Sequence, residues 1–241
     1  MKNKVPLLSS ILLLGLAIDI YPMYAEEISP VIHETEGTIL LKTDDESTPP
    51  VDPENPDPTN PIDPSDPPDT GTGGPLSIDY SSRFKFGLQQ ISTLDKIYYA
   101  SADIMGNNLR KPTYVQVTDK RGTLAGWKLT ISQPNQFKTV DGDILEGAEL
   151  TLTKGEVASS VNSDYTPTVV EDRLSLKPGV GNFLVINAKK NTGVGTWIYR
   201  FGSDEKENRD AVQLKIPGTS VKLAKKYSTE LVWTLEDTPN N

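Results

Sequence analysis

Hydrophobic and polar residues alternate in many short stretches from Leu76 onward, which is typical of β-strands with one buried face. Glycine, proline and aspartate separate the stretches, as in turns. The clearest stretches are residues 84–86, 114–118, 127–132, 148–153, 182–188, 195–201, 211–216 and 229–235. No stretch shows convincing helical periodicity. The pattern predicts an all-β fold, an antiparallel β-sandwich or barrel-like single domain over residues 76–241.

A proline-rich and aspartate-rich segment, residues 44–75, precedes this domain. Proline recurs every few positions and usually follows Asp or Asn, which favours extended backbone. We therefore expect an extended linker that ends in a flexible joint at residues 71–74. The short segment before it, residues 26–43, holds one strand-like stretch, Gly-Thr-Ile-Leu-Leu-Lys at 37–42. That stretch is too short to fold alone, and it could add to a sheet edge of its own domain or of a neighbour.

The N-terminus has the layout of a secretory signal peptide. Lys2 and Lys4 precede a mostly apolar run over residues 5–18, and Ala25 offers a small residue for cleavage. Residues 1–25 are therefore expected to be removed on export. No later segment is apolar enough to cross a membrane, so we expect no membrane anchor.

The acidity of the chain is concentrated in one segment. The formal net charge is -9, and residues 44–69 hold nine acidic residues and no basic one. From residue 76 to 241 there are 21 Lys and Arg against 19 Asp and Glu, a net charge of +2. A nearly neutral domain without a long basic block argues against nucleic acid as a partner.

Residues for catalysis or metal binding are scarce. The chain has no cysteine and a single histidine, His33, which lies before the linker. A Ser-His-Asp triad, a zinc site and disulfides are therefore not expected. Asp141 and Asp143 share a turn that is only weak evidence for calcium, and a carboxylate pair for glycoside cleavage stays open. We expect no catalytic residue, no metal and no cofactor.

Two Trp-x-Leu triplets are the most distinctive feature of the second half of the chain: Trp127 with Leu129, and Trp233 with Leu235. In a strand, residues two apart share a face, so both triplets fit a sheet core. They also fit an exposed ridge that stacks on a glycan or docks a partner, and a mixed case is open. Weaker candidates are the aromatic row with Trp197 and Tyr199, and Arg121 in a turn; their ordinary role would be core and solvated turn.

Four segments of the chain resemble the WxL domain of Gram-positive cell-surface proteins. They are GPLSIDYSSRFKFG, YVQVTDKRGTLAGWKL, LEGAELTL and the terminal LVWTLEDTP. A single Trp-x-Leu carries almost no information, but two with these surroundings are specific. The Asp-Pro-rich lead-in TGTGGPLSIDY is also similar to the family's, so the resemblance covers nearly the whole exported chain.

The resemblance implies a secreted, non-enzymatic protein that attaches non-covalently to the peptidoglycan of the cell wall. It also implies a WxL-interacting surface protein as a partner, in complexes at the cell surface. The alternative is a structural subunit held mainly by that partner, with indirect wall contact. Because the domain is nearly neutral, we expect recognition through shape, stacking and hydrogen bonds. The candidate contact residues are Trp127, Leu129, Trp233 and Leu235.

Overall fold

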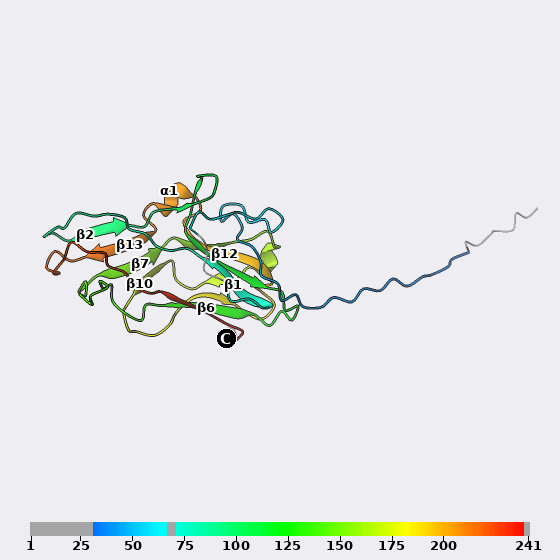
Figure 1. Cartoon of the computed structure of the whole chain (residues 1–241). Coiled ribbons are helices and arrows are strands. Elements are labelled where there is room, and N and C mark those ends of the chain that lie inside the picture. Colours follow the sequence, from blue (N-terminus) through cyan, green and yellow to red (C-terminus); the bar gives the residue numbers. More distant parts are fainter. Residues whose placement is uncertain (1–30, 67–70, 239–241) are drawn as a thin grey trace, which may run out of the picture. The chain divides into compact units, whose positions relative to one another are not determined.

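The structure is a computed structural model that describes residues 31–66 and 71–238 (Figure 1). The predicted signal peptide lies outside these residues. The chain divides into two units, residues 1–40 and 41–241. In the first unit, residues 31–40 carry no helix or strand and are exposed. The strand-like stretch at 37–42 therefore has no strand partner within the described part of the chain.

Nearly all regular structure in the second unit is antiparallel β-sheet, so the predicted all-β class is confirmed. Three four-stranded sheets have the orders β1-β5-β12-β8, β10-β7-β13-β2 and β14-β6-β11-β9, and a small pair is β3-β4. The first sheet contains β1 (Leu76–Ser81), β5 (Tyr114–Asp119), β8 (Gly155–Ala158) and β12 (Gly195–Phe201). The second contains β2 (Lys96–Tyr99), β7 (Glu149–Thr153), β10 (Arg173–Leu176) and β13 (Val212–Ile216). The third contains β6 (Trp127–Ser132), β9 (Thr168–Val169), β11 (Phe183–Ala188) and β14 (Val232–Glu236). The remaining elements are β3 (Asp103–Ile104), β4 (Arg110–Lys111), the 3₁₀ turn η1 (Ser163–Tyr165) and α1 (Glu205–Asn208).

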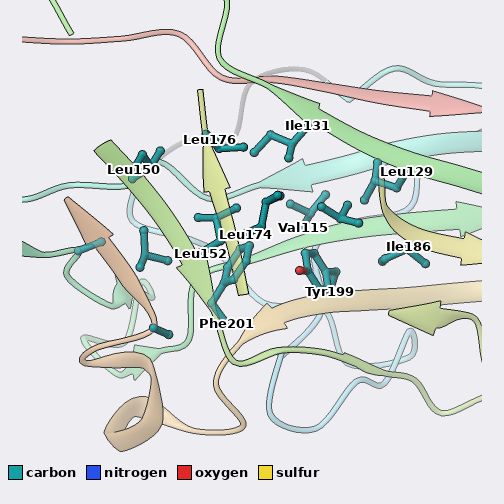
Figure 2. Close-up of a cluster of buried hydrophobic side chains, with 14 of the residues drawn as sticks. Val115, Leu129, Ile131, Leu150, Leu152, Leu174, Leu176, Ile186, Tyr199 and Phe201 are labelled. Carbon is teal, nitrogen blue, oxygen red and sulfur yellow. The ribbon is translucent and has the colours of Figure 1, made fainter. Parts of the chain in front are cut away.

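One hydrophobic core joins the three large sheets. Figure 2 shows side chains from all three directed into the same cluster, among them Val115, Leu129, Leu152, Ile186 and Tyr199. These residues come from the alternating stretches that the sequence identifies, because in a strand every second side chain reaches the same face. A shared core makes the sheets one cooperative body.

Two local expectations differ from the structure. The alternating stretch around Phe84 and Phe86 is not a strand; Phe84 packs edge-on against Phe201 at 5.5 Å between ring centroids. The helix α1 was not expected, because one turn is too short to show a helical period. It is preceded by Asp204, whose side chain accepts a hydrogen bond from the N–H of Glu207 at 2.8 Å, as an N-cap does.

Residues 44–66, called the strap below, pack against the domain instead of forming an extended spacer. Val51 is only 1% exposed and lies in a small buried cluster with Tyr80, Tyr114 and Ile198. The proline pattern correctly indicates extended backbone, but extended backbone can also lie along a sheet. Prolines lack an N–H, so a proline-rich strap leaves fewer donors to satisfy when it is buried.

Candidate functional site

The first Trp-x-Leu triplet lies on β6, an inner strand of its sheet. Trp127 and Leu129 have no exposed surface, and both belong to the main core. The indole Nε1 of Trp127 donates a hydrogen bond to the carbonyl of Gly193 at 2.8 Å. A buried indole that is both packed and hydrogen-bonded is a fold determinant. Of the two roles open for this triplet, the structure places it in the core.

Two glycines allow close packing around Trp127, Gly193 against the indole and Gly126 against the neighbouring backbone. Gly193 has a φ of 78°, and a Cβ there would lie 2.5 Å from Nε1 of the indole. Gly126 has a φ of 83°, and a Cβ there would lie 2.3 Å from the carbonyl oxygen of Ala188. Any larger residue would therefore meet both a steric clash and an unfavourable backbone conformation. The buried position of Trp127 therefore depends on these two glycines as well as on the triplet itself.

Arg121 clamps the turn that leads into the first triplet. Its Nε and Nη2 donate to the carboxylate of Asp119 at 3.0 and 2.8 Å, and Nη2 also donates to the carbonyl of Gly126 at 2.8 Å. The hydrogen bond to Asp119 raises the pKa of Arg121. The Asp119 side chain is 3% exposed and that of Arg121 15%. The guanidinium therefore serves the fold, and little of it remains to steer a partner.

The second triplet lies on β14, directly beside the first. β14 pairs with β6 so that Trp233 is opposite Ile131 and Leu235 is opposite Leu129. The two triplets, distant in sequence, are thus neighbours in one sheet. β14 is the edge strand of that sheet, and Trp233 and Leu235 are only partly buried. The Trp233 ring stands edge-on to the Tyr199 ring, with 6.5 Å between centroids. This triplet alone retains surface for a contact.

The aromatic row on β12 is core. Trp197 and Tyr199 are 3% and 2% exposed. Trp197 donates from Nε1 to the carbonyl of Val194 at 2.9 Å, and burial raises the pKa of Tyr199. Neither ring offers a face on which a sugar could stack.

A polar hollow of about 280 Å³ lies next to the start of β14. Its lining residues are Asn135, Gln136, Lys138, Ser228, Thr229 and Glu230. Thr229 donates from its hydroxyl to the carbonyl of Asn135 at 2.6 Å, which holds the two sides of the hollow together. Residues 228–230 run directly into β14, so the hollow and the second triplet share one segment of chain. The amides and the two hydroxyls here can both donate and accept hydrogen bonds, the lysine donates and the carboxylate accepts.

Polar residues beneath the strap form a cluster that the sequence did not predict. Gln116 accepts from the N–H of Val51 at 2.9 Å and donates to the carbonyl of Pro49 at 3.0 Å. Arg200 donates to the carbonyl of Pro53 at 2.6 Å, and Lys111 pairs with two strap carboxylates. Gln116 is fully buried, although its place in an alternating strand suggests the solvent face. In the sequence, the only indication of this cluster was that some strands have polar residues while a separate segment is acidic and proline-rich.

Asp141 and Asp143, the weak calcium candidates, are bridged by a lysine. Nζ of Lys225 lies 2.9 Å from Asp141 and 2.8 Å from Asp143, and the ion pair lowers the pKa of Asp143. The described residues contain no group of three or more metal-ligating side chains. The candidate residues therefore form a salt bridge in a turn.

Fold and site together define an all-β module whose two Trp-x-Leu strands pair at one sheet edge. A family model described as "WxL domain surface cell wall-binding" matches residues 30–239. The chain belongs to this WxL family, as the sequence segments predicted. It is thus a cell-surface, wall-binding protein of a family defined by binding and not by catalysis. No curated protein and no solved structure matched the chain. Over residues 31–66 and 71–238, no helix is long and apolar enough to cross a membrane.

Proposed function

We propose that the protein attaches non-covalently to peptidoglycan through the β14 face, defined here as Trp233, Leu235 and the adjoining polar hollow. The observation that carries the proposal is the unequal burial of the two triplets. Trp233 and Leu235 pack against the core but stay partly exposed, unlike Trp127 and Leu129, and they adjoin a hollow lined by hydrogen-bonding groups. Glycan strands present hydroxyls together with apolar ring faces. A partly exposed indole beside amide and hydroxyl groups suits both features.

Co-sedimentation with purified, protein-free peptidoglycan tests this proposal. Trp233→Ala should lower the retained fraction at least fivefold, because the indole is the largest apolar side chain of the face. Val221→Ala is the control, since Val221 is an exposed apolar residue that belongs neither to the β14 face nor to β2. Equal retention of the wild-type chain and Trp233→Ala would count against the β14 face.

A second candidate is attachment through a WxL-interacting surface protein, with indirect wall contact. The free edge of β14 supports it, because an edge strand presents unpaired backbone groups to a strand of another protein. The same co-sedimentation assay separates the candidates. Direct binding predicts retention on protein-free peptidoglycan, whereas indirect binding predicts retention only on walls that still carry their surface proteins.

A further inference from the structure

An unpaired apolar stretch and an unpaired apolar sheet edge occur in the same chain. The stretch is Ile39, Leu40 and Leu41, whose exposed fractions are 85%, 95% and 81%. The matched family region begins at residue 30, so the stretch belongs to the family's domain and is not a remnant of the leader. Within the described residues it has no strand partner. Three consecutive large apolar residues place apolar side chains on both faces of a strand, which is typical of strands covered on both sides.

The apolar edge is β2, the outermost strand of the second sheet. Its Ile97 and Tyr99 are 49% and 47% exposed. Ile97 is paired with Lys215, which is exposed, so Ile97 and Tyr99 lie on the outer face of the sheet. Apolar residues on the outer face of an edge strand are the ones that natural sheets usually avoid.

More exposed apolar residues precede β2. They are Leu88, Ile91 and Leu94, with exposed fractions of 101%, 58% and 66%. The hydroxyl of Tyr98 lies 3.5 Å from the carbonyl of Gln90, so the loop runs on the Tyr98 side of the strand, opposite Ile97 and Tyr99. A strand added to β2 would therefore meet apolar side chains on both of its faces. This is the environment that the 39–41 stretch requires.

We infer that residues 37–42 of one chain add as a strand to the β2 edge of a second copy. The charges agree, because Glu34 and Glu36 precede the stretch while exposed Lys96 and Lys215 flank the edge. Pairing along the backbone supplies affinity, and the apolar side chains set the register.

The short chain between Asp44 and the stretch favours the β2 edge of a second copy over the β2 edge of the same chain. Asp44 is held by Lys120, at 2.8 Å, beyond the end of β5. From there back to residue 37 an extended chain spans only about 20 Å to 25 Å at ~3.3 Å per residue. The N–H of Lys120 donates a hydrogen bond to the carbonyl of Pro75, so Lys120 lies beside the start of β1. Figure 1 shows β2 at the opposite end of the second unit from β1. A second copy removes this limit.

Donor and acceptor are different surfaces, so each chain can both give and receive a strand. Such a head-to-tail contact does not close on itself unless the rotation between copies happens to close a ring. The chains therefore form open assemblies whose size grows with concentration. This self-association is independent of wall binding and is measured without peptidoglycan.

The absence of cysteine from the chain allows a direct test by crosslinking. Leu40→Cys and Tyr99→Cys are introduced into separate exported chains, which are mixed and oxidised. A disulfide-linked dimer of one chain with the other is expected. The controls are Ile32→Cys as donor, from the same exposed terminal segment, and Thr234→Cys as acceptor, on the β14 edge. Crosslinking to Thr234→Cys at an equal or higher yield would overturn the assignment to β2.

Sedimentation velocity over a range of concentrations provides the second measurement. The exported wild-type chain should associate, and Ile39→Asp combined with Leu41→Asp should weaken association at least tenfold. These positions are exposed, so the variant leaves the folded domain intact, and the thermal melting curve verifies it. A wild-type chain that remains monomeric at every concentration, or a double variant that associates equally well, would refute the inference.

Discussion

The two Trp-x-Leu triplets share one sequence pattern and lie on paired strands, but their environments differ. Trp127 is completely buried on the inner strand β6, whereas Trp233 is partly exposed on the edge strand β14. Trp127 points into the core from an inner strand and has no surface to offer a ligand, whereas an edge strand has one open side. A sequence motif therefore identifies a strand pair, and position in the sheet separates the strand that builds the fold from the strand that is free to bind.

The largest expected effect is on stability, at the first triplet. Trp127→Ala should lower the free energy of unfolding by about 3–5 kcal/mol, because it empties a fully packed site and leaves the carbonyl of Gly193 without its donor. Chemical denaturation followed by circular dichroism measures the loss. Trp127→Phe, which keeps most of the volume, should lose clearly less. A loss no larger than that of Trp233→Ala would contradict the contrast between the triplets.

The next effect concerns the clamp in front of the first triplet. Arg121→Ala should cost about 3 kcal/mol, because it leaves the buried carboxylate of Asp119 and the carbonyl of Gly126 without their shared donor. The matched control is Arg209→Ala, whose side chain is 71% exposed and reaches Glu205 only at 3.7 Å. Removing that exposed pair should cost less than about 0.5 kcal/mol. Similar losses for both variants in the same denaturation assay would show that Arg121 is not a clamp.

A smaller effect follows from the close backbone approach at the first triplet. Gly193→Ala should destabilise the domain by about 2 kcal/mol, because the new methyl would crowd the Trp127 indole. Gly122→Ala controls for the backbone conformation: its φ of 68° is similar, but nothing lies within 4 Å of the added Cβ. The difference between the two melting curves isolates the steric part. Identical curves would mean that the indole can move aside.

The sequence predicted the positions of the strands far better than it predicted which segments pack against them. β12 occupies the predicted residues 195–201, and β7 and β11 begin one residue later than expected, because alternation reports directly on a strand with two different faces. Docking of the strap leaves no such local trace. Its prolines indicate extended backbone, and only the folded sheet shows that Gln116 is positioned to bind that backbone.

The candidate site shows the same limit. The motif predicted Trp127 and Trp233 equally, and their different exposure follows from strand order, which depends on pairings between residues far apart in the chain. Arg121 was an ordinary turn residue in the sequence, and its bond to the carbonyl of Gly126 appears only once the turn has closed. Long-range pairing, and not local propensity, decides which member of a repeated motif is exposed.

The smallest expected effect on stability is at the second triplet. Trp233→Ala should cost only about 1–1.5 kcal/mol, because part of the side chain already contacts solvent in the folded state. The contact with the ring of Tyr199 accounts for some of that loss. The same variant should nevertheless show the largest loss in co-sedimentation with peptidoglycan.

The strongest test of the difference between the triplets is that their variants rank in opposite order for stability and for retention on peptidoglycan. If Trp127 builds the fold and Trp233 binds, stability and retention must respond to the two alanine variants in reverse order, each measured on folded protein below its own melting temperature. Trp233→Phe should show intermediate retention, since phenylalanine keeps an aromatic ring but has a smaller apolar surface. Retention that follows stability across Trp127→Phe, Trp233→Phe and Trp233→Ala would mean that wall binding reports only on the folded fraction, and both triplets would then be parts of the core.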